Sequence, residues 1–126
     1  MTTEQFTLLR ALYFHLIRVR FHYDLYMHKQ IYIRAKVIER ANKDVMKIIS
    51  SLILTGAIAD DLKEILFSLV VHYDHWFVQF EIAEDKLKPQ SDSTFIFTRD
   101  DDIPAFPSQL LDRLSSIINN QINSQE

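Results

Sequence analysis

The chain has no cysteine, only one glycine and only three prolines among its 126 residues. Without cysteine it forms no disulfide, no catalytic thiolate and no cysteine-ligated zinc site. Average usage would supply roughly nine glycines, and glycine serves tight turns and the loops that cradle phosphates. The sequence therefore excludes both common glycine-rich nucleotide-binding loops and predicts long helices joined by few tight turns.

Long hydrophobic runs are also missing. The most apolar N-terminal stretch, residues 11–17, contains His15 and is flanked by Arg10 and Arg18. A membrane-spanning helix needs about twenty apolar residues, and the basic, apolar and small-residue order of a signal peptide is not present. We therefore expect no membrane span. Together with the missing cysteine, this favours a cytoplasmic location.

The composition is that of one ordinary globular domain covering residues 1–126, with 48 % hydrophobic and 25 % charged residues. Neither glycine nor proline interrupts the first 55 residues. Because a single helix of that length would span about 80 Å, we predict a break near residues 28–30. The second helix should end at Gly56, where a left-handed cap residue is wanted.

The predicted fold is all-α, a small bundle of four principal helices. A third helix is expected from Asp60 or Asp61 until Pro89 ends it, and a last helix from Ser108. All three prolines fall in an irregular excursion over residues 89–107. We expect this excursion to pack on the bundle, because its Phe95, Ile96 and Phe97 are costly to leave in water. A polar tail over residues 119–126 should fray.

The predicted helix at residues 61–88 is apolar on two opposite faces. The first face consists of Leu62, Leu66, Leu69, Tyr73, Trp76, Phe80, Ala83 and Leu87, at the steps of three and four that a core-facing helix shows. The second consists of Phe67, Val71, Val78 and Ile82. A helix that is apolar on both sides must be covered on both sides, either by its own chain or by a partner.

This pattern predicts a protein–protein interface on the second face, formed by Phe67, Val71, His75, Val78 and Ile82. Aromatic side chains, which are favoured at interfaces, make up 12 % of the chain. We therefore predict a non-catalytic interaction or accessory module that associates with a protein partner, most simply a second copy of itself.

Histidine is the residue in which metal chemistry would be found. His72 and His75 lie about one helical turn apart, with Asp74 between them, and metal ligands on helices use such spacings. A di-iron bundle, however, needs a Glu followed three residues later by His on each of two helices, and the sequence has no such pair. We therefore expect no metal and no cofactor, and interpret His72 as a histidine at the edge of the core.

Arg10 and His15 form the alternative catalytic pair. Their spacing resembles the Arg, four to six residues, then His motif of ribonucleases of the HEPN family, and that resemblance implies a small all-α ribonuclease that uses these two side chains. The sequence departs from the family pattern in that Ala11 replaces a polar residue and the pair lies in the first helix. On a regular helix about 140° would separate the two side chains.

Charge is polarised along the chain. Residues 1–50 hold nine Lys and Arg against four Asp and Glu, and residues 51–126 hold five against thirteen. The basic and acidic helices can neutralise each other within one bundle, or complementary halves can meet between subunits. A third possibility is nucleic-acid binding by a basic face of the first helix. This basic face consists of His15, Arg18, His22 and Lys29.

Overall fold

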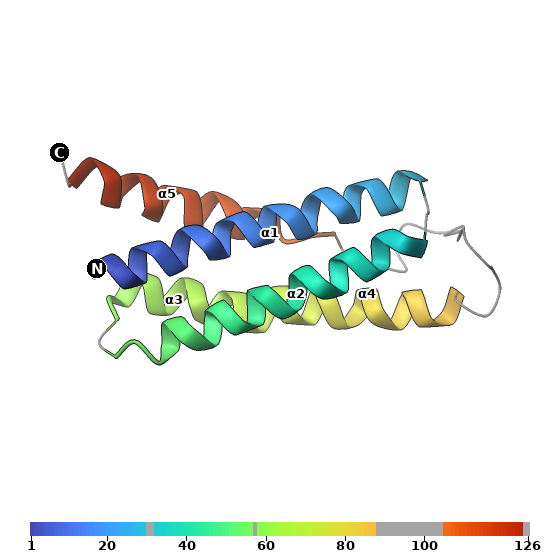
Figure 1. Ribbon diagram of the computed structural model, residues 1–126, viewed down its shortest axis with the longest axis horizontal. Helices are drawn as coiled ribbons and strands as arrows, with labels where there is room; N and C mark the ends of the chain where they lie inside the picture. The colour runs from blue at the N-terminus through green and yellow to red at the C-terminus, as the bar shows by residue number, and fades with distance from the viewer. Residues whose placement is uncertain (30–31, 57, 88–104, 125–126) are drawn as a thin grey trace.

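The computed structural model describes residues 1–29, 32–56, 58–87 and 105–124, and these residues form helices and no strand. The elements are α1 (Thr3–Lys29), α2 (Tyr32–Ile53), α3 (Asp60–Ser68), a π-helical turn η1 (Leu69–Tyr73), α4 (Asp74–Leu87) and α5 (Ser108–Ser124). Because α3, η1 and α4 follow one another without a break, they form one long rod. Figure 1 shows four rods that alternate in direction, with both chain ends at the same end of the bundle. The all-α prediction is confirmed.

Most of the predicted helix boundaries agree with the structure. α1 ends at Lys29 and α2 begins at Tyr32, on either side of the predicted break. α2 ends at Ile53 instead of at Gly56, and Gly56 lies in the turn that follows, with a positive φ of 98°, the conformation that glycine adopts most readily. The predicted packing of Phe95, Ile96 and Phe97 concerns residues outside the described ranges. The end of α5 differs from the expectation, since the helix continues to Ser124.

The continuation of α5 has a simple physical reason. The residues after Ile118 are mostly Asn, Gln and Ser, which have weaker helix propensity than Ala but do not break a helix as Gly or Pro does. Ile118 is itself buried and anchors the preceding turn to the core. Polarity alone is therefore a poor signal for the end of this helix.

The π turn η1 was not predicted. Here the backbone N–H of Asp74 donates to the carbonyl oxygen of Leu69, five residues earlier, instead of four. Such wide turns occur as single insertions in α-helices. The apolar pattern of the rod continues through the turn, so nothing in the spacing of hydrophobic residues indicates it.

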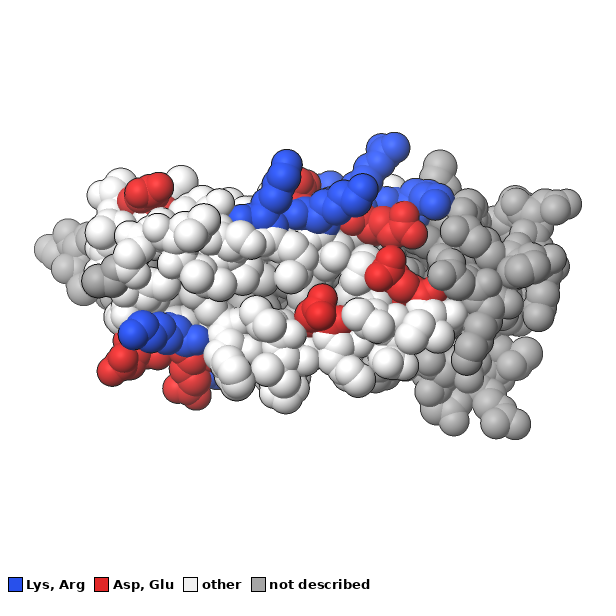
Figure 2. All heavy atoms as spheres, turned by 90° about the horizontal axis from the view of Figure 1, so that it is seen from below, with Lys and Arg blue, Asp and Glu red and all other residues white. Residues whose placement is uncertain are grey.

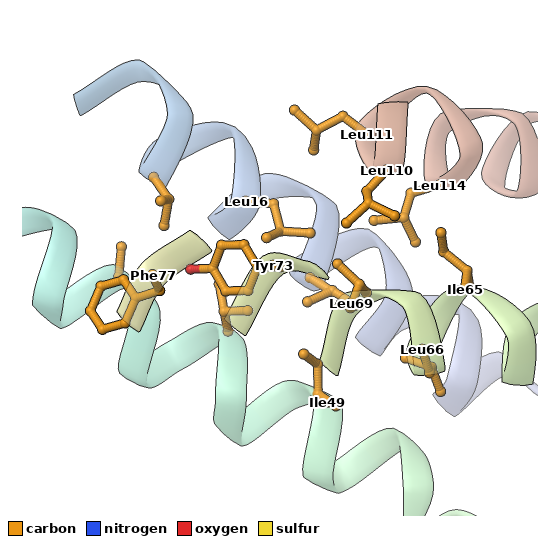
Figure 3. Close-up of a cluster of buried hydrophobic side chains, with 14 of the residues drawn as sticks. Leu16, Ile49, Ile65, Leu66, Leu69, Tyr73, Phe77, Leu110, Leu111 and Leu114 are labelled. Atoms are coloured by element: carbon orange, nitrogen blue, oxygen red, sulfur yellow. The ribbon is translucent and has the colours of Figure 1, made fainter. Parts of the chain in front are cut away.

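Each rod places one apolar row in the core, at the alternating three- and four-residue steps of helices packed side by side. On α1 the row is Leu9, Leu12, Leu16, Val19 and Tyr23, and on α2 it is Ile38, Ala41, Val45, Ile49 and Leu52. The third rod contributes Leu62, Ile65, Leu66, Leu69, Tyr73, Trp76, Phe77 and Phe80, and α5 contributes Leu110, Leu111, Leu114 and Ile118. Figure 3 shows members of these rows converging from all four rods. The predicted inner face of the third helix is confirmed from Leu62 to Phe80.

Aromatic rings fill the core around Trp76. Its ring centroid lies 5.0 Å from that of Tyr23, 5.8 Å from that of Phe80 and 4.9 Å from that of Phe106. The Tyr23 and Phe106 contacts are edge-to-face and the Phe80 contact is stacked, geometries that aromatic pairs prefer. α1, α4 and the segment before α5 are therefore joined by one aromatic cluster.

The start of α1 is fastened to the end of α2. Thr2 Oγ1 accepts the backbone N–H of Gln5 at 3.0 Å, and Gln5 Oε1 accepts that of Thr2 at 3.1 Å, which is a complete capping box. The Gln5 side-chain amide also donates to Thr55 Oγ1 at 3.1 Å. Gln5 is only 3 % exposed, so one buried polar side chain both caps a helix and joins two of them.

We expect Gln5→Leu to lower the free energy of unfolding by about 1 to 3 kcal/mol, because the backbone N–H of Thr2 loses its cap and the Thr55 hydroxyl loses a donor. Thr7→Ala, at an exposed position of the same helix, is the control and should change stability by less than about 0.5 kcal/mol. Urea denaturation followed by circular dichroism measures both. Equal stabilities of the two variants would show that the junction contributes nothing.

Candidate interaction surfaces

The second apolar face of the third rod is exposed. Phe67 is 70 % exposed, Val71 42 %, Val78 41 % and Ile82 45 %. Val70, which the sequence pattern did not single out, is also exposed on this rod, and His75 lies on the surface among them. The exposed side chains on this side of the rod form its outer face, which consists of Phe67, Val70, Val71, His75, Val78 and Ile82. No other described part of the chain covers these side chains.

The outer face is a band of limited width beside charged groups. Asp74 and Glu81 lie within the same segment of the rod, and Asp74 is half-buried while Glu81 is exposed. Figure 2 shows a broad uncharged surface beside a row of basic side chains. Single exposed apolar residues are normal on protein surfaces, but a contiguous band marks a surface that is covered in use.

The predicted basic face of α1 is a short chain of contacts. The Arg18 guanidinium donates to Nδ1 of His15 at 2.9 Å and lies 4.0 Å from a carboxylate oxygen of Asp44 on α2. His22 is half-buried and its ring lies edge-on to that of Phe21. The side chain of Lys29 lies outside the described residues. One carboxylate from α2 thus offsets part of the positive charge on this face.

Arg10 and His15 do not act as a pair in this structure. The Arg10 guanidinium lies over the ring of Phe6, 5.7 Å from its centroid, whereas His15 contacts Arg18. The two side chains leave α1 in different directions, as expected for a separation of about 140° on a regular helix. The described residues therefore give the alternative nuclease pair no joint site.

α2 carries a second basic row, which was not predicted from the sequence. It consists of Lys36, Arg40, Lys43 and Lys47, at steps of four, three and four, which place all four on one side of a helix. Lys36 pairs with Glu39 at 3.6 Å, while Arg40, Lys43 and Lys47 form no ion pair within the described residues. Arg40, Lys43 and Lys47 also line an open depression, and its remaining lining residues are Asn42, Asp44, Met46, Ser50 and Ser51. The regular spacing is the signal that could have identified this row.

Two phenylalanines on α1 were also missed. Phe14 is 58 % and Phe21 56 % exposed, on the side of α1 that faces away from the core. Arg18 lies between them in sequence, four residues after the first and three before the second, so the three side chains form one row. Their position opposite the buried row is the signal that marks them as surface residues.

Groups suited to metal binding or proton transfer are sparse in the described residues. His72 and His75 are both exposed, so His72 is not a core-edge histidine, and no three His, Asp or Glu side chains lie close enough together to hold a metal ion in the described part. Among the groups of the described residues, Tyr73 has a marked shift: burial, with a contribution from the charge of Asp74, raises its pKa above the ordinary value. Its hydroxyl donates to Asn42 Oδ1 at 2.7 Å, which is a structural contact between η1 and α2.

Comparison with other proteins adds no assignment. No known protein family, curated protein or solved structure matches this chain. None of the helices in the described ranges has the length and hydrophobicity that crossing a membrane requires.

Proposed function

We propose that the protein is a non-catalytic interaction module that associates with a second copy of itself through the outer face of the third rod. The observation that carries the proposal is the exposure of apolar side chains between Phe67 and Ile82 on a rod whose other side is buried from Leu62 to Phe80. Burying such a band removes apolar surface from water, which is the main favourable term in protein association.

A protein partner fits this band better than a lipid surface does. The carboxylates of Asp74 and Glu81 lie on the same stretch of the rod, and anionic headgroups would repel them, whereas membrane-surface helices carry Lys and Arg beside their apolar face. A second copy is the simplest protein partner, because a straight helical face can pair with itself about a two-fold axis. The proposed interface residues are Phe67, Val71, His75, Val78 and Ile82, with Val70 added.

Val78→Glu is the direct test. A carboxylate placed at the centre of the contact would be buried without a partner, which is unfavourable. We expect the wild-type protein to be an oligomer in size-exclusion chromatography with light scattering, and the variant to require at least about tenfold higher concentration to assemble. That factor corresponds to about 1.4 kcal/mol.

Leu54→Glu is the matched control, since Leu54 is exposed but lies in the turn after α2, away from the outer face. It should assemble like the wild type. Both variants should keep the helical circular dichroism spectrum, because Val78 is exposed in the single chain. A wild-type protein that stays monomeric at high concentration, or a Val78→Glu variant that unfolds, would contradict the proposal.

A further inference from the structure

The exposed row on α1 and the basic row on α2 belong to one side of the bundle. Arg18, in the middle of the α1 row, reaches Asp44 on α2, and Asp44 lies in sequence between Lys43 and Lys47 of the basic row. The two helices are neighbours in the fold and run in opposite directions. Figure 2 shows most of the visible Lys and Arg side chains along one edge of the molecule, with some Asp and Glu side chains next to them.

We propose that this side of the bundle binds single-stranded nucleic acid. The binding surface comprises Phe14, Arg18 and Phe21 on α1 with Arg40, Lys43 and Lys47 on α2. The inference goes beyond self-association and does not depend on it, because the outer face belongs to the third rod.

The basic row has the chemistry and spacing of a phosphate-contacting surface. At a rise of about 1.5 Å per residue, its steps of three and four residues place successive cations about 4.5 to 6 Å apart along the helix. Arg40, Lys43 and Lys47 form no ion pair within the described residues, and one carboxylate, that of Asp44, lies in the same depression. Cations in a row attract a polyphosphate chain and release its counterions, which favours binding.

The two exposed phenylalanines favour a single-stranded over a double-stranded nucleic acid. Two exposed rings seven residues apart are separated by about 10 Å along the helix, and an unpaired base can stack on an exposed aromatic ring. Bases within a double helix are already stacked on each other and cannot use such rings. An exposed ring beside a row of cations is the arrangement by which proteins hold single strands without reading their sequence.

A membrane surface fits this side of the bundle less well. Helices that lie in a bilayer interface have a broad, continuous apolar face, whereas Arg18 interrupts the row formed by Phe14 and Phe21. Vesicle binding is accordingly an outcome that counts against the proposal.

Fluorescence anisotropy with a labelled oligodeoxythymidine of about 20 nucleotides measures binding and tests how much the basic side chains contribute to it. The logarithm of the binding constant falls linearly with the logarithm of the salt concentration, with a slope of about −0.7 for each phosphate contacted on a single strand. For three contacted phosphates, a fourfold rise in salt concentration should weaken binding about 20-fold. The double variant Lys43→Gln/Lys47→Gln should bind at least about tenfold more weakly than the wild type and show a shallower salt dependence. Lys63→Gln, which removes an exposed cation from α3, should leave binding unchanged.

The same assay tests the rings. Phe14→Ala and Phe21→Ala should each weaken binding at least about fivefold, because a lost stacking contact affects one base each, while Leu54→Ala should have no effect. Circular dichroism establishes that all variants remain helical, as expected for exposed positions. The proposal is overturned if the oligonucleotide does not bind, if binding is unaffected by both phenylalanine changes, or if phosphatidylserine vesicles bind and the oligonucleotide does not.

Discussion

Trp76→Ala is expected to remove about 3 to 5 kcal/mol from the free energy of unfolding. The Trp76 side chain is 2 % exposed and contacts rings from α1, α4 and the segment before α5. Its loss therefore leaves a cavity at the point where three parts of the chain meet. Because a domain of this size is stable by only about 5 to 15 kcal/mol, a large share of the molecules should unfold on mild warming.

Two further variants make this test specific. Trp76→Phe keeps an aromatic ring and leaves a smaller cavity, so it should lower the free energy of unfolding clearly less than Trp76→Ala does. Leu54→Ala, at a position that is 84 % exposed, should change stability by less than about 0.5 kcal/mol. Urea denaturation followed by circular dichroism compares all three. If Trp76→Ala were no worse than Leu54→Ala, the aromatic cluster would not be part of the stabilising core.

A second large effect is expected at alkaline pH. Burial raises the pKa of Tyr73 in the folded state, whereas in the unfolded chain this phenol ionises near its ordinary value of about 10. Above pH about 10 the Tyr73 hydroxyl therefore stays protonated in the folded state but loses its proton in the unfolded chain. The stability that this tyrosine contributes is fully present below pH about 10 and is lost as the pH rises above it, by about 1.4 kcal/mol per pH unit.

Tyr73→Phe isolates this contribution. Between pH about 10 and 12 the wild-type protein should lose about 2 to 3 kcal/mol more than the variant, while near neutral pH the variant should be weaker by only about 0.5 to 1.5 kcal/mol, the worth of the hydrogen bond to Asn42. Lysines that titrate in this range do so in both proteins and cancel in the difference. Parallel stability curves for the two proteins would show that Tyr73 does not couple folding to pH.

The fold was largely predictable because most of it depends on local signals. The scarcity of glycine and proline and the row from Leu62 to Phe80 sufficed to place the helices and the inner face. The capping box of Thr2 and Gln5 was equally readable, since Thr followed three residues later by Gln is its signature. The contact from Gln5 to Thr55 was not, because it joins positions that are fifty residues apart and depends on how α1 and α2 pack.

The candidate surfaces also combine features that the local sequence indicates with features that depend on how the helices pack. The sequence placed Phe67 and Val78 opposite the core row but left open whether the chain itself covers them, and the structure leaves both exposed. The row of Arg40, Lys43 and Lys47 carries a helical spacing and was readable, but its relation to Phe14 and Phe21 requires the packing of two helices. Spacing along one chain segment determines which residues share a side, whereas only the three-dimensional arrangement determines which sides adjoin.

The π turn has a consequence for changes in chain length. A turn of this kind holds one residue more than a regular α-helix requires. Deleting Val70 or Val71, which are exposed within this turn, would close a regular helix and leave Trp76 and Phe80 on the side that faces the core. A deletion inside α4 would instead rotate everything after it by about 100° and turn core residues outward. The rod therefore contains one place at which a single-residue deletion, an event common in gene divergence, leaves the packing in register.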